Sequence, residues 1–273
     1  MSFSLDLRYQ ICLQPIELPI FNPVALELLQ LLADPEIEMD DIIKTINKDQ
    51  SLSVQTLRLA NSSAYAGRSK AETIKAAVNR LGAQKISSLA MAASQAAVHA
   101  SEIPVVDKVL RELWRHSYTC AIGCRSLALG TRHKALAERA YLAGLLHDIG
   151  KLYLLKAMEH ISMNPETRFE LDQETLLEVF SDMHVEQGCR TMEHWNIPVI
   201  FGSVVANHHT EQFDPQDTLL AIVRLVNFYS VRYNLNLYPR SIQPDDAAAE
   251  ISALGVSEAD LAKLKADMSG SLN

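Results

Sequence analysis

Apolar residues recur along most of the chain at the three- and four-residue spacing of one helix face, which predicts a largely helical protein. The first clear helix begins at Asn22, because an Asn N-cap followed by Pro at the first helical position is typical of a helix start. Its apolar face continues for about eleven residues until Asp34-Pro35 ends the run. Residues 1–21 are expected to form an irregular lead-in, since Pro15 and Pro19 discourage a regular helix.

Further helices are predicted in the amino-terminal part of the chain. Ser51 and Thr73 are expected to cap two of them, because a side-chain hydroxyl accepts a hydrogen bond from the first turn. Gly82 fits a C-cap position, and the helix after it is rich in Ala and Ser, whose small side chains suit close packing. The predicted ranges are 39–48, 51–60, 74–81 and 83–98.

The rest of the chain also shows helical periodicity. Asn164-Pro165 and Asn196-Ile197-Pro198 are the strongest breaks, and no segment alternates like a β-strand. The predicted ranges are 106–129, 134–158, 173–195, 198–208 and 218–233, followed by two short tail helices, about 245–253 and 257–267, separated by Gly255. The pattern therefore predicts an all-α protein.

Breaks near Pro104 and Pro244 suggest how the chain is divided. We expect an amino-terminal helical part over residues 1–100, a second helical part over residues 101–240, and a helical tail over residues 241–273. The second part contains the residues that are candidates for chemistry.

The apolar run Tyr141–Leu146 ends on His147 and Asp148, with Lys151 just beyond. Three other helical segments contain further histidines, which are His116, His184, His208 and His209. Imidazole nitrogens and carboxylate oxygens are ligands that suit iron, zinc or manganese. The sequence therefore predicts a metal site if the helices turn these side chains toward one another.

Composition and charge narrow the classes of function. The chain has 273 residues, 48% apolar content and a net charge of -8, which favours a globular protein and argues against a generic binder of nucleic acid. No signal sequence and no apolar run of roughly 18 residues is present, so we expect a cytoplasmic protein with no membrane partner. The four cysteines show no CxxC spacing, as expected in a reducing compartment.

Two of these cysteines, Cys120 and Cys124, lie four and eight residues after His116, so all three share one helix face. A mixed His/Cys metal site is one interpretation. The ordinary interpretation is that a buried cysteine acts as a small apolar side chain.

The order of His116, His147-Asp148, Lys151, His184 and His208-His209 resembles the HD superfamily of metal-dependent phosphohydrolases, especially its HD-GYP branch of cyclic-dinucleotide phosphodiesterases. The chain as a whole resembles a related branch more, the HDOD domains of bacterial signalling proteins. This second resemblance extends over roughly residues 18–235. The segments that support it are Leu31–Pro35, Ile46–Ser53, Leu57–Tyr65, Asn79–Ile86, Leu113–Ser117, Ala143–Gly150, His184–Cys189 and Trp195–Pro198.

The resemblance implies an HD-like helical bundle with an additional amino-terminal helical subdomain, and it assigns roles to the candidate residues. Asp148 would bridge two metal ions, one held by His116 and His147 and the other by His184, His208 and His209. Glu112 is a further candidate ligand, although a solvated residue paired with Arg111 or Arg115 is the alternative. In an enzyme, Asp148 and Lys151 would be catalytic, with Lys151 neutralising a bound phosphate; otherwise Lys151 is a surface partner of Asp148.

Two departures from the phosphodiesterase pattern weaken the enzyme interpretation. Asn227 stands where the HD superfamily has its last Asp, so this candidate ligand brings no negative charge. Residues Thr210–Pro215 replace the acidic residue and the GYP loop. With so few carboxylates we expect one divalent ion, Fe, Mn or Zn, rather than two.

Three hypotheses for the function follow. The resemblance to HDOD implies a regulatory module that acts through contacts with a signalling protein, whose identity the sequence does not give. The alternatives are a metal-dependent phosphohydrolase acting on a nucleotide or cyclic dinucleotide, and a metal or redox sensor. A phosphate-containing ligand fits the second of these, and residues 61–70 and the acidic tail are candidate contact surfaces.

Overall fold

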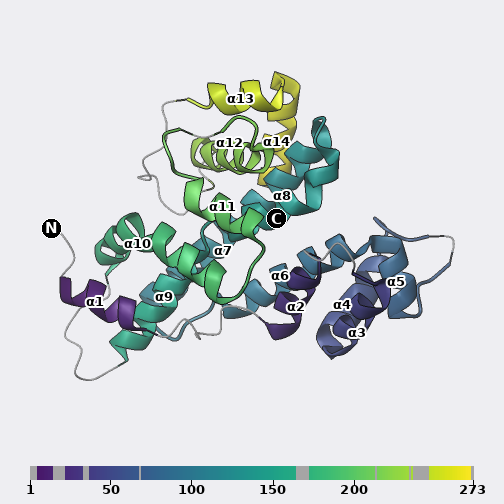
Figure 1. The fold of residues 1–273 in the computed structure, drawn as a ribbon, viewed down its shortest axis with the longest axis horizontal. Coiled ribbons are helices and arrows are strands. Elements are labelled where there is room, and N and C mark those ends of the chain that lie inside the picture. The colour runs from purple at the N-terminus through teal and green to yellow at the C-terminus, as the bar shows by residue number, and fades with distance from the viewer. Residues whose placement is uncertain are drawn as a thin grey trace. The chain divides into compact units, whose positions relative to one another are not determined.

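The computed structural model describes residues 5–14, 22–32, 37–67, 69–163, 172–212, 214–233, 235 and 246–271 (Figure 1). Every regular element in these ranges is a helix, which confirms the all-α prediction. The chain divides into two compact units. The larger contains Met1–Ile20, His99–Trp195 and Val199–Asn273, and the smaller contains Phe21–Val98 and Asn196–Pro198. The division proposed from the sequence, at residues 100 and 240, stays a prediction.

The smaller unit contains five helices within its described residues: α2 (Pro23–Leu31), α3 (Met39–Asn47), α4 (Gln50–Ala60), α5 (Ile74–Leu81) and α6 (Ala83–Val98). The Asn22 side chain caps α2 as expected, and Thr73 caps α5, which ends at Gly82 with φ 80°. The prediction that Ser51 caps the next helix was wrong. Asp49 caps α4 by accepting from the Leu52 amide, and an Asp carboxylate at this position also interacts favourably with the helix dipole.

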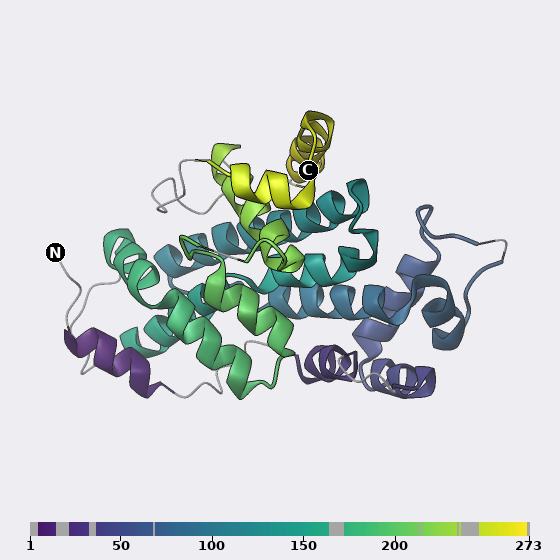
Figure 2. The same ribbon diagram turned by 45° about the horizontal axis from the view of Figure 1, so that its top comes forward.

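The larger unit is built around the long helix α7, which packs against α8, α12 and α14, while α9 packs against α10 (Figures 1 and 2). The tail helices α13 and α14, coloured yellow, lie beside α12 and α7 respectively. The helices of this unit are α1 (Leu5–Leu13), α7 (Pro104–Gly130), the 3₁₀ turn η1 (Lys134–Leu136), α8 (Ala137–Leu146), α9 (Ile149–Ser162), α10 (Gln173–His194), α11 (Val199–Asn207), α12 (Thr218–Arg232), α13 (Ala248–Leu254) and α14 (Glu258–Gly270).

Helix α1 contradicts the expectation of an irregular lead-in. Leu7 and Ile11, one turn apart, are 3% and 0% exposed, so the helix buries one face. Arg8 forms ion pairs with Asp182 and Glu186 on α10. Tertiary contacts of this kind stabilise a short helix that propensity alone does not. The two prolines behind the expectation, and the predicted break at Asn164-Pro165, lie outside the described residues.

The single helix predicted over residues 134–158 is also wrong, because the chain breaks at His147 and Asp148. These two residues form the turn between α8 and α9. No proline marks this break in the sequence, and the apolar residues on either side are buried around the whole helix. Because neither helix has a polar face, the spacing of apolar residues could not show where one helix ends and the next begins.

Two glycines bring the neighbouring helices close to this turn. A Cβ at Gly144 would lie 2.9 Å from the Cys120 carbonyl oxygen on α7, and one at Gly150 would lie 1.8 Å from the His184 carbonyl oxygen on α10. Both positions therefore require the absence of a side chain. The close approach of α8 to α7 and of α9 to α10 brings the His147-Asp148 turn next to both helices.

The tail follows the sequence prediction. Gly255 ends α13 with φ 64°, and Ser257 begins α14 with a capping box to Asp260. None of the helices in the described ranges combines the length and the apolar character that crossing a membrane requires.

Candidate metal centre

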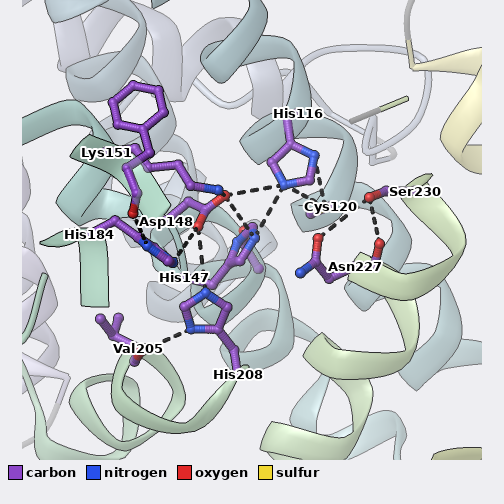
Figure 3. Close-up of polar contacts among 12 residues, drawn as sticks. His116, Cys120, His147, Asp148, Lys151, His184, Val205, His208, Asn227 and Ser230 are labelled. Carbon is purple, nitrogen blue, oxygen red and sulfur yellow. Dashed lines mark hydrogen bonds and ion pairs between the residues drawn. The ribbon is translucent and has the colours of Figure 1, made fainter. Parts of the chain in front are cut away.

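Residues from two helices and two turns meet inside the larger unit. His116 comes from the middle of α7, His147 and Asp148 from the turn between α8 and α9, and His184 from α10. His208 and His209 follow the end of α11. Figure 3 shows the labelled imidazoles turned toward the Asp148 carboxylate. All of these residues are buried except His209, which is exposed.

Backbone carbonyls fix three of the imidazole rings. His147 Nδ1 lies 2.8 Å from the Gly144 oxygen, His184 Nδ1 lies 2.6 Å from the Phe180 oxygen, and His208 Nδ1 lies 2.8 Å from the Val205 oxygen. A carbonyl can only accept, so each Nδ1 must hold a proton and donate it. In the neutral ring the Nε2 atom then presents a lone pair. Metal-binding histidines are oriented by bonds of the same kind.

One side of the Asp148 carboxylate faces two of these lone pairs. Oδ1 lies 3.5 Å from His208 Nε2 and 3.9 Å from His184 Nε2. All three atoms are buried, and none has a hydrogen-bond partner within the part of the chain that the structure describes. Three buried polar atoms thus face one another with no hydrogen bond among them.

The other side of the carboxylate is satisfied by the protein. Lys151 Nζ donates to Oδ2 over 2.7 Å, and this lysine side chain is 15% exposed. His116 Nε2 and His147 Nε2 each lie 3.4 Å from Oδ2 and 3.3 Å from each other. Because His147 presents a lone pair at Nε2, His116 donates in this last bond.

Burial and neighbouring charges shift the pKa values in a way that suits metal binding. Burial lowers the pKa of His147 to about 3, and burial together with the Lys151 charge lowers the pKa of His184 to about 3. Burial alone would raise the pKa of Asp148, but the Lys151 ammonium holds it well below its usual range. At neutral pH these groups are therefore two neutral imidazoles and a carboxylate, the forms that bind metal ions.

His116 differs from the other histidines. Burial acts to lower its pKa, but the adjacent Cys120 and Asp148 side chains outweigh burial and raise the pKa to about 10. A protonated His116 does not bind a metal, so an ion on this side must displace a proton.

The candidate ligand atoms form two groups in the described chain. One group is Asp148, His184, His208 and His209, and the other is His116, Cys120 and His147, with the atoms of each group within 4.8 Å of one another. The structure thus brings together the histidines and Asp148 that the sequence suggested. Cys120, which the sequence had raised in a mixed His/Cys site with His116, lies in the second group (Figure 3).

The remaining candidates lie differently. Glu112 is half-buried, and neither of the two groups found in the described residues includes it. Asn227 is buried, and Figure 3 shows its side chain extending from α12 toward the cluster, with Oδ1 3.5 Å from Ser230 Oγ. Lys151 is the partner of Asp148, and its side chain is half-buried.

A buried ion pair supports the loop that contains His208 and His209. Arg224 Nε on α12 donates to Glu250 Oε1 on α13 over 2.7 Å, and both residues are buried. The same guanidinium donates to the Thr210 carbonyl over 2.6 Å and contacts the Asn207 carbonyl at 3.4 Å. This link could not be predicted from the sequence, because a single Arg and a single Glu have no characteristic spacing.

Comparison with known proteins gives a family match and several similar structures. The model of the HDOD domain matches residues 18–211. An uncharacterized protein of Treponema pallidum (strain Nichols) is 25% identical over 217 residues, which is 77% of this chain and 42% of the relative. The chain thus spans less than half the length of that relative.

Two solved structures share the fold. A protein of Shewanella amazonensis SB2B, provisionally named a metal-dependent phosphohydrolase, has a TM-score of 0.67 and 22% identity, with 96% of each chain covered. An HDOD domain protein of unknown function from Geobacter sulfurreducens has a TM-score of 0.64 and 20% identity over 97% of this chain and 93% of the other. At these identities the similarity shows the fold alone.

Proposed function

Because the chain belongs to the HDOD family, we propose that it is a signal-transduction protein that acts through protein contacts and that its His/Asp cluster binds a divalent metal ion. The observation that supports metal binding is the set of three buried acceptors, Asp148 Oδ1, His184 Nε2 and His208 Nε2, with no hydrogen-bond partner among the described residues.

The chemistry of the donor set fits a cation. Buried polar atoms are almost always hydrogen-bonded, and each one that is not costs about 1–3 kcal/mol. A divalent ion among Oδ1 of Asp148 and the two Nε2 atoms would satisfy all three at once, and His209 offers a fourth ligand atom. Nitrogen and carboxylate ligands suit Fe, Mn or Zn. When bound, the ion supplies positive charge, and its ligands would join α10 to the turns before α9 and after α11.

The contacts of Asp148 favour one such ion rather than two. Oδ1 lacks a partner, but Oδ2 already accepts from Lys151 at 2.7 Å. His116 and His147 hydrogen-bond to each other at 3.3 Å, so this side of the carboxylate is satisfied without a metal. An ion of the kind that prefers oxygen and nitrogen ligands therefore belongs on the Oδ1 side.

Burial favours regulation over turnover. The side chains of His147 and Asp148 are 0% and 1% exposed, so a phosphate ester has little access to an ion beside them. Asn227 supplies no negative charge to a second ion. A buried ion that joins several helices changes the stability and shape of the unit when it binds, and a partner protein can detect such a change.

Metal analysis of the purified protein tests this proposal. Protein prepared anaerobically without a His tag should retain about one equivalent of ion, and Asp148→Asn and His184→Ala should each lose it. The control is His160→Ala, which changes an exposed histidine on α9. Retention of the ion by both site variants, or no uptake of Fe, Mn or Zn by the unaltered protein, would disprove metal binding at this cluster.

A second candidate function is a metal-dependent phosphohydrolase acting on a nucleotide or cyclic dinucleotide. The observation in its favour is the Lys151 ammonium, which lies at the cluster and could neutralise a phosphate, with Asp148 holding the ion. Hydrolysis of bis(p-nitrophenyl) phosphate and of cyclic dinucleotides should then require added metal and fall in Lys151→Met. If none of the metals Fe, Mn and Zn supported hydrolysis, only the regulatory role would remain, and a metal or redox sensor would be its simplest form.

The loop after α4 is our candidate contact surface for the signalling partner. Arg80 supports this loop by donating to the Ala60 and Ser69 carbonyls, and residues 63–67 are exposed. Exposed backbone on a rigid support is a common arrangement for recognition. Alanine substitutions across residues 61–67 should remove a partner that co-purifies with the protein. An unchanged set of partners would exclude this loop.

A further inference from the structure

Cys120 lies next to the cluster but has no part in the proposed ion site. It follows His116 by one turn of α7 and is 1% exposed. Its Sγ atom lies 3.8 Å from both ring nitrogens of His116. The Sγ atom and ligand atoms of His116 and His147 all lie within 4.8 Å of one another.

These separations are close to those of ligands that share one ion. In a tetrahedral zinc site the bond lengths place two nitrogens about 3.3 Å apart, and a nitrogen and a sulfur about 3.5 Å apart. His116 Nε2 and His147 Nε2 are 3.3 Å apart, and His116 Nε2 is 3.8 Å from Cys120 Sγ.

We propose that Cys120 is a metal ligand and that, with His116 and His147, it forms a second site that accepts only thiophilic ions such as Zn²⁺ and Co²⁺. This inference goes beyond the proposed function, which requires an ion only on the Asp148 Oδ1 side. Thiolate sulfur favours zinc over harder ions such as Mn²⁺.

Charge is the main reason to assign this role to the cysteine. An ion between His116 and His147 needs an anionic ligand, but Lys151 already holds the near oxygen of Asp148, and Asn227 is neutral. The thiolate of Cys120 supplies the missing negative charge. On binding, the S–H bond of Cys120 and the Nε2–H bond of His116 break, and both protons pass to water. The electron pairs left on the sulfur and on the nitrogen form the bonds to the ion.

Cobalt binding to the full chain tests the site directly. Co²⁺ added to the metal-free protein should produce the thiolate-to-cobalt charge-transfer absorption in the near ultraviolet. Cys120→Ala and Cys120→Ser should both lose this band. The matched control is Cys124→Ala, which removes a second buried thiol one turn further along α7 and should keep the band.

The same series separates this inference from the proposed function. His184→Ala should lose the ion on the Oδ1 side and keep the cobalt–thiolate band, whereas Cys120→Ala should lose the band and keep the other ion. The unaltered protein should bind one equivalent of Mn²⁺ but two of Zn²⁺. A band that persists in both Cys120 variants, or two equivalents of Mn²⁺, would overturn the inference.

X-ray absorption on the unaltered zinc-loaded protein gives a reading that does not depend on how well a variant folds. The zinc edge should contain a sulfur scatterer at about 2.3 Å in addition to nitrogen and oxygen at shorter distance. A spectrum with nitrogen and oxygen alone would show that Cys120 is not a ligand.

Discussion

A histidine that donates its Nδ1 proton to a carbonyl of its own helix has a fixed ring orientation. His184 bonds the carbonyl of Phe180, four residues earlier, and His208 bonds that of Val205, three residues earlier. The helix that contains His184, and the helix that ends just before His208, therefore also aim the Nε2 atoms of these residues. Such rings lose little side-chain entropy when an ion binds, which favours affinity.

The buried neutral histidines should make the metal-free protein sensitive to acid. The pKa values of His147 and His184 fall from 6.5 to about 3 in the folded protein. Between these values the unfolded chain binds protons that the folded chain does not, so stability falls as pH falls from about 6.5 toward 3. Each such histidine should contribute a slope of about 1.4 kcal/mol per pH unit. Urea unfolding at several pH values, with a chelator present, measures this slope.

His184→Gln should reduce that slope by the contribution of one histidine, about 1.4 kcal/mol per pH unit, because glutamine does not titrate. His160→Gln, at the exposed end of α9, should leave it unchanged. A slope that is the same in all three proteins would mean that His184 is not a buried neutral imidazole.

At the scale of the helices, Gly150 determines how closely α9 approaches α10. A Cβ at this position would lie 1.8 Å from the backbone oxygen of His184, and backbone cannot rotate away as a side chain can. Gly150→Ala should therefore separate the two helices, destabilise the protein by about 3 kcal/mol or more, and weaken metal binding. Urea unfolding and metal titration measure the two effects.

Gly270→Ala is the matched control for this substitution. A Cβ at Gly270 meets no described atom within 4 Å, so alanine there should change the free energy of unfolding by less than about 1 kcal/mol. Equal effects of the two substitutions would show that the close approach at Gly150 is not what matters.

The tail helix α13 should influence the metal centre through Glu250. Removing this carboxylate in Glu250→Ala leaves a buried Arg224 without its partner on α13, at a cost of about 3–5 kcal/mol. Arg224 is then held less firmly as a donor to the Asn207 and Thr210 carbonyls, which lie on either side of His208 and His209. The affinity for the ion should therefore fall roughly tenfold. Calorimetric titration with Mn²⁺ measures the affinity. Glu258→Ala, an exposed change on α14, should leave it unaltered.

The helices could be predicted from the sequence wherever local chemistry defines them. Asn22, Thr73 and Gly82 cap helices through contacts with residues close to them in the sequence, so α2 and α5 were located correctly. The break between α8 and α9 could not be predicted, because neither side of it has a polar face. Helix α1 was missed because its stability comes from Arg8 and from burial of Leu7 and Ile11, which are contacts with distant parts of the chain.

The candidate site was predictable in residue type but not in arrangement. Metal-binding side chains are uncommon on buried helix faces, so the histidines and Asp148 could be selected from the sequence. The orientation of the histidine rings depends on the backbone carbonyls of Gly144, Phe180 and Val205. Every residue has a backbone carbonyl, so the sequence does not show which ones are used. Cys120 could be considered from its spacing, which puts it one turn from His116, but only the structure brings it near His147.

At the scale of the whole molecule, all candidate ligands lie in the larger of the two units. The smaller unit, with α2–α6, supplies none of the ligand atoms found in the described chain. Its helices have their own caps and their own core around Ala60, Ala71 and Ala77. A bound ion should therefore stabilise one unit without acting directly on the other.

Hydrogen exchange tests this separation. An ion present at a hundred times its dissociation constant adds about 2.7 kcal/mol to the stability of the state that binds it. Amides of α8–α11 that exchange only when the larger unit opens should slow by about a hundredfold on metal binding, because exchange follows the free energy of opening. Amides of α2–α6 should keep their rates. Asp148→Asn should abolish the slowing. Equal protection of both units by the metal would mean that they open together, and the signal would then extend to the loop at residues 61–67.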